Sequence, residues 1–201
     1  MEQSHFELLQ SQYHDYFMVE HQTHVNIRPL EGPIPNETEF ELRIPAPFLM
    51  ASEMTELDRS MLKPLARLGD IADDLALYLK AQARKIDTLM RYILLQQDDP
   101  SERYMTYSYG GSALNFISST PLEPGQLLEI KLFLDQSEGA VFAYAVVLSV
   151  ETLDQHFLVR TTYSNVREQD REIIVRASLH QQSRQLKRKA EQRQLAAQSP
   201  S

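Results

Sequence analysis

The sequence has no cysteine and no tryptophan, and glycine accounts for only 6 of its 201 residues. Without cysteine, the chain has no disulfides, no thiolate metal ligands and no cysteine nucleophile. The scarcity of glycine disfavours a glycine-rich nucleotide-binding fold. No apolar run approaches the ~18 residues that a membrane helix needs, and the N-terminal residues MEQSHFELLQ lack the pattern of a signal peptide. We therefore expect a cytoplasmic protein with no membrane partner.

Charge is unevenly distributed along the chain, whose formal net charge is −8. The net charge is −6 over residues 1–51, zero over 52–97, −6 over 98–180 and +4 over 181–201. Such an acidic body opposes nucleic-acid binding, because that affinity comes mostly from basic groups that displace counterions from phosphates. We therefore expect no nucleic acid among the partners.

Only the C-terminal tail offers a basic surface to an anionic partner. Its basic residues are Arg184, Lys187, Arg188, Lys189 and Arg193. A basic helix end is most often simply solvated, and cations are also favourable near a helix C-terminus. The tail alone therefore predicts no specific binding.

Alternating polar and apolar residues predict β-strands on both sides of a central helical segment. Residues 24–28 alternate, and so do residues 39–44, where Phe40, Leu42 and Ile44 share one face. Prolines and a glycine between these two runs exclude regular structure there, so we predict two strands joined by a long turn. Five more short strands with tight turns between them indicate a small barrel or sandwich. They are predicted at residues 103–109, 113–118, 127–134, 140–150 and 156–163.

A final helix is predicted after these strands. Asn165, followed three residues later by Glu168, has the spacing of a capping box. Ile173, Ile174 and Ala177 would form the inner face of this helix before it becomes basic.

Residues 52–97 carry a heptad pattern typical of a coiled coil. Apolar residues recur at alternating spacings of three and four, and the charges around them balance. The a and d positions are Met61, Leu65, Leu68, Ala72, Leu75, Leu79, Gln82, Ile86, Leu89 and Ile93. At a rise of 1.5 Å per residue, residues 65–97 would span roughly 50 Å, which is longer than a small domain is wide. Such a helix either projects from its domain or is covered by a partner.

Two interpretations of the heptad pattern are open. In one, the apolar stripe packs on the chain's own β domain; in the other, it joins subunits into a dimer or a tetramer. Strict a/d spacing makes a narrow seam that suits another helix, whereas packing on a sheet needs a broader stripe. We therefore favour self-association, in which Gln82 would help to fix the register.

Signatures of catalysis and of metal binding are missing. The sequence has no G-x-S-x-G, P-loop, H-E-x-x-H or G-x-G-x-x-G motif. The acidic pairs at 73–74 and 98–99 are expected to be solvated, on a helix face and in a loop. His21 and His24 would point to opposite faces of a strand, so we expect no metal there. We predict no catalytic residues and no enzymatic activity.

The second β region resembles the PilZ domain family. The resemblance rests on residues 106–116, TYSYGGSALNF, on the segments PLEPGQLLEIKLFL, VFAYAVVLSVE and HFLVRTTY, and on the closing NVREQDREIIVRASLHQQSRQL. It covers residues 103–190 and implies an α+β fold, a small antiparallel β-barrel with a C-terminal helix. Many members of the family are receptors for cyclic di-GMP. The long helix is then an inserted coiled-coil helix between the first strands, which resembles an atypical, tetrameric PilZ subfamily.

The resemblance also implies where cyclic di-GMP would bind. In the family, an R-x-x-x-R lead supplies charged, bidentate contacts to the nucleotide, but here its places hold His14 and Met18. The motif D/N-x-S-x-x-G appears as Thr106, Ser108 and Gly111, so threonine replaces a carboxylate or an amide. Losing several charged hydrogen bonds, worth about 1.5–3 kcal/mol each, would weaken binding by orders of magnitude.

We therefore predict a non-catalytic regulatory protein of cyclic di-GMP signalling, without a cofactor, that forms a homo-oligomer and acts through other signalling proteins. Because the resemblance is to a tetrameric PilZ subfamily, we expect this oligomer to be a tetramer. The predicted parts are 1–51, with the lead and first barrel strands, 52–97, the oligomerisation helix, and 98–201, the barrel with its C-terminal helix and basic tail. The alternative is a genuine cyclic di-GMP receptor with an altered site, which would use Ser108, Gly111 and the arginines Arg84 and Arg91 of another chain.

Overall fold

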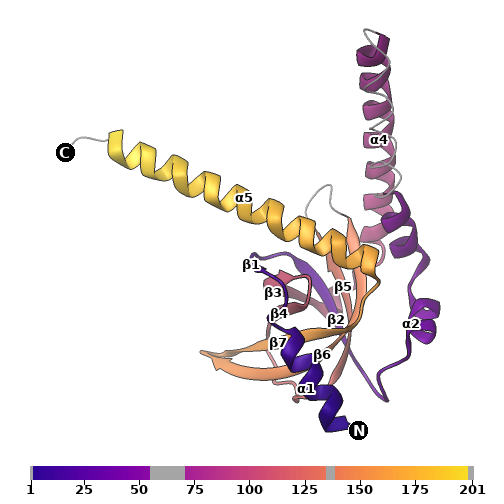
Figure 1. Cartoon of the computed structure of the whole chain (residues 1–201), viewed down its shortest axis with the longest axis vertical. Helices are drawn as coiled ribbons and strands as arrows, with labels where there is room; N and C mark the ends of the chain where they lie inside the picture. The colour runs from indigo at the N-terminus through magenta and orange to yellow at the C-terminus, as the bar shows by residue number, and fades with distance from the viewer. Residues whose placement is uncertain (1, 55–70, 135–138, 199–201) are drawn as a thin grey trace.

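A β-barrel with two projecting helices forms the chain (Figure 1). The computed structural model describes residues 2–54, 71–134 and 139–198. Its helices are α1 (Glu2–Gln12), α2 (Glu37–Arg43), a helix over residues 46–54, α4 (Ile71–Leu95), the 3-10 helix η1 (Pro100–Glu102) and α5 (Glu168–Gln198). Its strands are β1 (Met18–Glu20), β2 (His24–Leu30), β3 (Arg103–Gly110), β4 (Ala113–Ser118), β5 (Leu127–Phe133), β6 (Ala140–Leu153) and β7 (His156–Asn165). Within these ranges, no helix has the length and apolar character needed to cross a membrane.

The barrel closes because β4 pairs with both β7 and β3. The strand order is β3-β2-β5-β6-β7-β4, and all pairs are antiparallel. The short β1 and β2 lie one after the other along the same edge of β3, with Met18 opposite Gly110 and His24 opposite Met105. Together they occupy one position in a six-membered ring of strands. The predicted antiparallel barrel is confirmed, and the helical insertion falls between β2 and β3.

Alternate residues of the strands fill the barrel interior. On β5, Leu128, Ile130 and Leu132 are buried in this core, as their period of two requires. Ile173 and Ile174 of α5 join the same core, and Figure 1 shows the first half of α5 lying across one end of the barrel. The five strands predicted between residues 103 and 163 and the C-terminal helix are therefore confirmed.

Helices cover the outer face of β6, which explains why this strand is almost entirely apolar. Phe142 and Tyr144 pack in a second core with Phe40 of α2 and Phe48 of helix 46–54. The ring centroids of Phe40 and Tyr144 are 5.3 Å apart, and those of Phe48 and Phe142 are 5.9 Å apart. Met90 of α4 is buried in the same cluster. A strand buried on both faces loses the polar–apolar alternation, and here the burial attaches the insertion to the barrel.

The strand predicted over residues 39–44 is wrong, because these residues belong to α2. The Asn36 side chain accepts a hydrogen bond from the Glu39 N–H at 3.0 Å, and the Glu39 carboxylate accepts one from the Asn36 N–H at 3.2 Å. This capping box starts a helix. Phe40 and Ile44, four residues apart, are buried together, whereas Leu42 is 82% exposed. The burial therefore follows the period of a helix and not that of a strand.

The predicted capping role of Asn165 is also wrong. Asn165 ends β7, and its side-chain amide donates to the carbonyl oxygen of Pro35 at 3.1 Å. The helix α5 begins at Glu168, and the Arg171 N–H donates to the Arg167 carbonyl oxygen at 2.9 Å. Acidic residues in the first turn of α5 are favourable at the positive end of the helix dipole.

The heptad segment is divided differently from the prediction. A helix begins at residue 46, earlier than the predicted start at 52, and α4 covers Ile71–Leu95. The heptad positions Met61, Leu65 and Leu68 lie outside the described residues, and Ala72 lies in the first turn of α4. Figure 1 shows α4 and the second half of α5 leaving the barrel in different directions.

Candidate functional site

Thr106 holds the junction between β1 and β2. It is buried on β3, and its Oγ1 accepts a hydrogen bond from the Thr23 N–H at 2.9 Å. The same hydroxyl donates to the carbonyl oxygen of His21 at 2.7 Å. Both contacts satisfy buried backbone groups at the point where the ladder changes from β1 to β2. The hydroxyl group is therefore engaged within the chain on both sides.

Ser108 belongs to a buried polar network that lies under residues 12–18, which we call the N-terminal lead. Its Oγ accepts a hydrogen bond from the Asn115 side-chain amide at 2.9 Å. The same amide donates to the Tyr13 hydroxyl at 2.7 Å. Ser112 continues the network, because its Oγ donates to the Tyr13 carbonyl oxygen at 3.0 Å. The network ties the lead to β3 and β4.

The turn at Gly110 and Gly111 is covered directly by the lead. A Cβ at Gly111 would lie 2.6 Å from Cγ2 of Val175 and 2.7 Å from Cδ1 of Tyr16. A Cβ at Gly110 would overlap the carbonyl oxygen of Phe17. Only glycine allows the backbones to approach this closely. The turn thus faces residues of its own chain.

His14 and Met18 lie at different places relative to this turn. Met18 is half-buried on β1, directly opposite Gly110. His14 is exposed, and its ring lies edge-on to that of Tyr13, with centroids 4.8 Å apart. The structure therefore brings Met18 to the glycine turn and leaves His14 in solvent.

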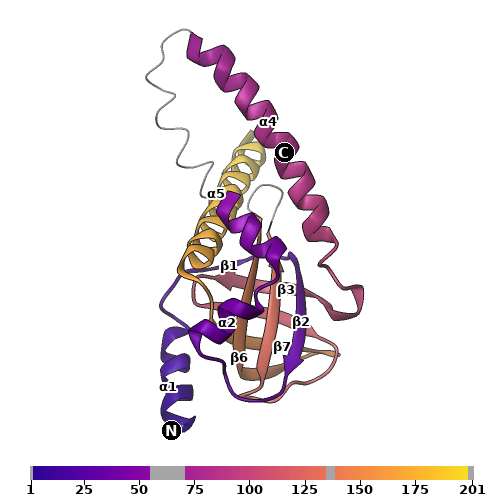
Figure 2. The same cartoon turned by 90° about the vertical axis from the view of Figure 1, so that its right-hand side faces the viewer.

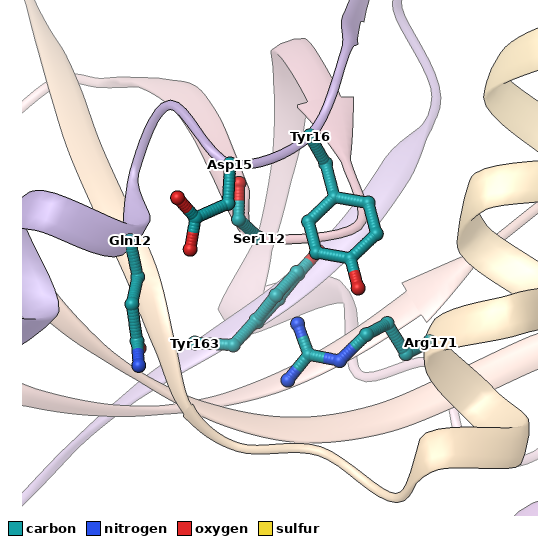
Figure 3. Close-up of a pocket in the computed structure, with 6 residues that line it drawn as sticks. All are labelled: Gln12, Asp15, Tyr16, Ser112, Tyr163 and Arg171. Carbon is teal, nitrogen blue, oxygen red and sulfur yellow. The ribbon is translucent and has the colours of Figure 1, made fainter.

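A polar pocket of about 260 Å³ lies beside the glycine turn (Figure 3). Its walls come from the lead, from the residue after the turn, from β7 and from the first turn of α5. The lining residues are Gln12, Asp15, Tyr16, Ser112, Tyr163 and Arg171. None of the five predicted ligand residues is among them, so the pocket is distinct from the motif positions.

Arg171 is held firmly in this pocket. Its Nη1 donates to the Gly111 carbonyl oxygen, its Nε lies 3.4 Å from a carboxylate oxygen of Glu168, and its Cζ lies 5.7 Å from the centroid of the Tyr16 ring. The last distance is that of a cation–π interaction. The guanidinium is therefore positioned before any ligand arrives.

Tyr163 contributes a buried hydroxyl that has no hydrogen-bond partner among the described residues. Burial raises the pKa of Tyr163, and the nearby Arg171 charge opposes this rise only in part. The group therefore stays protonated at neutral pH. It is a hydrogen-bond donor without an acceptor, which is unusual for a buried polar group.

A second candidate surface lies on α4. Leu75, Leu79, Ile86, Leu89 and Ile93 are each between 36% and 64% exposed. On the same stripe, the Gln82 side chain donates to the Tyr78 hydroxyl at 2.8 Å. The helix instead attaches to the barrel through a neighbouring stripe, in which Met90 and Leu94 are buried. These five heptad positions are thus only partly covered by the described part of their own chain.

The other acidic and histidine candidates form hydrogen bonds or ion pairs within the chain. Asp98 is not simply solvated as predicted, because it pairs with Arg103 at 2.6 Å and accepts a hydrogen bond from the Asn26 amide at 3.0 Å. Asp99 caps η1 by accepting hydrogen bonds from the Ser101 hydroxyl at 2.7 Å and from the Ser101 N–H at 2.8 Å, and these bonds, the hydroxyl first, lower the pKa of Asp99. His21 lies 3.0 Å from the Gln181 side-chain amide, with which it forms a hydrogen bond.

His24 and the helix arginines take no part in the pocket. His24 is exposed on β2, and Arg84 and Arg91 are exposed on α4. In residues 2–54, 71–134 and 139–198, no group of three or more histidine, aspartate or glutamate side chains could hold a metal ion. The basic tail residues from Arg184 to Arg193 lie on the exposed second half of α5.

No model of a known protein family matches the sequence, and no curated protein matches it. Among solved structures, a tetrameric PilZ domain from Xanthomonas campestris, self-assembled via a helical bundle, aligns with a TM-score of 0.51. The alignment has 15% sequence identity and covers 86% of this chain and 92% of that one. This chain has the PilZ fold.

Two further structures align over less than half of this chain. The PilZ domain of YcgR from Escherichia coli, solved with cyclic di-GMP, aligns over 47% of this chain and 83% of its own, with 14% identity and a TM-score of 0.37. The inhibitor of motility MotI from Bacillus subtilis aligns over 41% of this chain and 42% of its own, with 15% identity and a TM-score of 0.38.

Within this PilZ fold, sequence reasoning missed the residues that line the pocket. Asp15, Tyr163 and Arg171 lie far apart in the sequence, and no local spacing connects them. The only signal was indirect: Arg171 stands in the D-R-E-x-I-x-R stretch that contributes to the PilZ resemblance. That stretch marks the start of α5 but does not reveal what the arginine side chain faces.

Proposed function

We propose that this PilZ-fold protein is a non-catalytic regulator of cyclic di-GMP signalling that assembles into a tetramer through α4 and acts through protein partners. One observation carries the proposal. The described heptad residues of α4 form an apolar stripe that is left exposed, while other residues of the helix attach it to the barrel. A stripe with strict a/d spacing suits another helix of the same kind.

The similarity to the Xanthomonas campestris structure supports this proposal. That protein is a tetrameric PilZ domain self-assembled via a helical bundle, and its alignment covers 86% of this chain. In this chain the helix lies between β2 and β3 in the sequence and projects from the barrel (Figure 2), so it could pack against the same helix of another copy.

Weak binding of cyclic di-GMP in the family's usual mode is the second part of the proposal. His14 and Met18 supply no permanent positive charge where the resemblance places arginines. The Thr106 hydroxyl is already bonded to the junction of β1 and β2. A nucleotide would therefore lose the charged, bidentate contacts that fix its phosphates and bases.

The alternative function, a cyclic di-GMP receptor with an altered site, is favoured by one observation. Arg171 donates to the Gly111 carbonyl oxygen and so brings a guanidinium to the glycine turn from α5. This arginine would replace part of the missing charge of the lead.

The assembly is tested by light scattering coupled to size-exclusion chromatography. We expect the wild type to have the mass of a tetramer and the variant Leu79→Glu with Ile86→Glu to have the mass of a monomer, because the seam would bury both charges. Leu77→Glu is the matched control, since Leu77 is 65% exposed on α4 but lies off the heptad stripe. A monomeric wild type, or an unchanged mass in the double variant, would contradict the proposal.

A calorimetric titration of cyclic di-GMP separates the two functions. No saturable heat at micromolar protein supports a regulator that acts without the usual nucleotide site. Saturable binding with a defined stoichiometry that is lost in Arg171→Lys establishes the altered receptor instead.

A further inference from the structure

The pocket beside Gly111 plays no part in the assembly described above. It measures about 260 Å³ and is lined by none of the motif residues. Pockets for drug-sized ligands usually measure roughly 300–1000 Å³. This pocket therefore suits a smaller molecule, and its lining chemistry indicates which class.

One side of the pocket is built to receive an anionic group. The Arg171 guanidinium is held by the Gly111 carbonyl oxygen, by a Glu168 carboxylate oxygen 3.4 Å from its Nε, and by the ring of Tyr16. A guanidinium has five N–H donors, so the donors that Gly111 and Glu168 do not use can bind the carboxylate of a ligand. The Tyr163 hydroxyl is buried and lacks an acceptor among the described residues, and a ligand oxygen entering beside Tyr16 would supply one.

The opposite side of the pocket is negatively charged. Figure 3 shows Asp15 on the side of the pocket opposite Arg171, with its carboxylate directed toward Gln12. No ion pair joins Asp15 to Arg171 in the part of the chain that the structure describes. The carboxylate of Asp15 is therefore available to accept hydrogen bonds from a cationic group.

The two charges together restrict the ligand. An anion without a positive group would meet the Asp15 carboxylate, and a cation without a negative group would meet Arg171. We propose that this pocket binds a small zwitterion of the α-amino-acid class, with its carboxylate on Arg171 and Tyr163 and its ammonium group on Asp15. The site goes beyond the proposed assembly and does not depend on it, because no residue of α4 lines the pocket.

The test is an NMR titration of the full-length ¹⁵N-labelled chain with each of the twenty free amino acids at pH 7. We expect at least one to cause saturating shifts of the backbone amides of Ser112, Tyr163 and Arg171. Its N-acetyl derivative, which lacks the ammonium group, and its amide, which lacks the carboxylate, should each bind at least ~10-fold more weakly, because each loses a charge-assisted contact.

Variants locate the site. Asp15→Asn changes one exposed side chain and should weaken binding at least ~10-fold, as should Arg171→Lys, which keeps the charge but loses the planar fork. The matched controls, Asp154→Asn and Arg160→Lys, lie outside the pocket and should leave the affinity unchanged. The amide spectrum of each variant shows directly whether it is folded.

Three results would overturn the proposal. One is the absence of saturating shifts from every amino acid at up to about 10 mM, a range that detects a Kd of about 1 mM. Another is equal binding of the N-acetyl derivative, and the third is equal affinity in Asp15→Asn. The mass measured by light scattering is independent of these results, so failure here is distinguishable from failure of the assembly.

Discussion

The buried ion pair between Arg167 and Asp170 gives the sharpest test of how the helical insertion is fixed to the barrel. The Arg167 Nε lies 2.7 Å from an Asp170 oxygen, and their side chains are only 13% and 1% exposed. Ser52 of helix 46–54 donates to the same carboxylate and accepts a hydrogen bond from the Arg167 Nη2 at 2.9 Å. The three side chains thus join the base of the insertion to the start of α5.

Replacing Arg167 with methionine keeps most of the side-chain volume but leaves a buried carboxylate without its counter-ion. Removing one partner of a buried pair costs about 3–5 kcal/mol in the free energy of unfolding. For a chain of this length, 1 kcal/mol corresponds to about 2–4 °C in Tm, so we expect a fall of about 6–20 °C. Adding Asp170→Asn should recover about 1–3 kcal/mol, because the uncompensated charge is then gone.

Thermal unfolding followed by circular dichroism, at one fixed protein concentration, measures these changes. The control is Arg160→Met, which breaks the Arg160–Glu151 pair at 2.8 Å on the surface, where the side chains are 40% and 57% exposed. Such an exposed pair contributes less than about 1 kcal/mol. If Arg167→Met and Arg160→Met lower the Tm equally, the buried pair does not fasten the insertion and the reasoning fails.

The remaining predictions concern the same region. Gly111→Ala should lower the free energy of unfolding by about 1–3 kcal/mol in urea denaturation, because its Cβ would lie 2.6 Å from Cγ2 of Val175 and 2.7 Å from Cδ1 of Tyr16. An unchanged midpoint would mean that neither α5 nor the lead presses on the turn. Thr106→Val should lower the free energy of unfolding by about 1–3 kcal/mol, because it removes the hydroxyl that bonds to Thr23 and His21. Thr106→Ser should lower it by much less, since serine keeps the hydroxyl. Equal losses in the two variants would mean that the effect comes from packing. Burial raises the pKa of Asp170, and its bonds with Arg167 and Ser52 oppose that rise. The folded state therefore holds this proton more tightly than the unfolded state, so the stability should fall as the pH rises from about 3.9 through the folded pKa. The same denaturation series in Asp170→Asn should lack this part of the slope.

Local patterns in the sequence were enough to predict most of the barrel. Most strands between residues 103 and 163 alternate because one face enters the core, whereas β6 is an apolar run because it is buried on both faces. Both patterns can be read from neighbouring residues. The helix α2 was equally readable, since Asn36 and Glu39 have capping-box spacing and Phe40 and Ile44 are four residues apart. The alternation of Phe40, Leu42 and Ile44 competed with that signal and led to the wrong prediction of a strand.

The heptad pattern predicted a helix with an apolar stripe but could not decide what the stripe contacts. Which stripe of α4 packs on the barrel depends on the outer face of β6, where Phe142 and Tyr144 meet Phe48 and Met90. Such contacts join residues far apart in the sequence, and periodicity within one helix carries no information about them.

The pocket shows the same division between local and long-range information. Residue types and their spacing predicted the glycine turn, and the resemblance to the PilZ family implied the missing arginines of the lead. Only the closed barrel and the placement of α5 bring Asp15, Tyr163 and Arg171 around one cavity. The physical reason is that strand and helix periods follow from the backbone geometry of adjacent residues, whereas a binding site needs side chains whose distances are set by the packing of the whole chain.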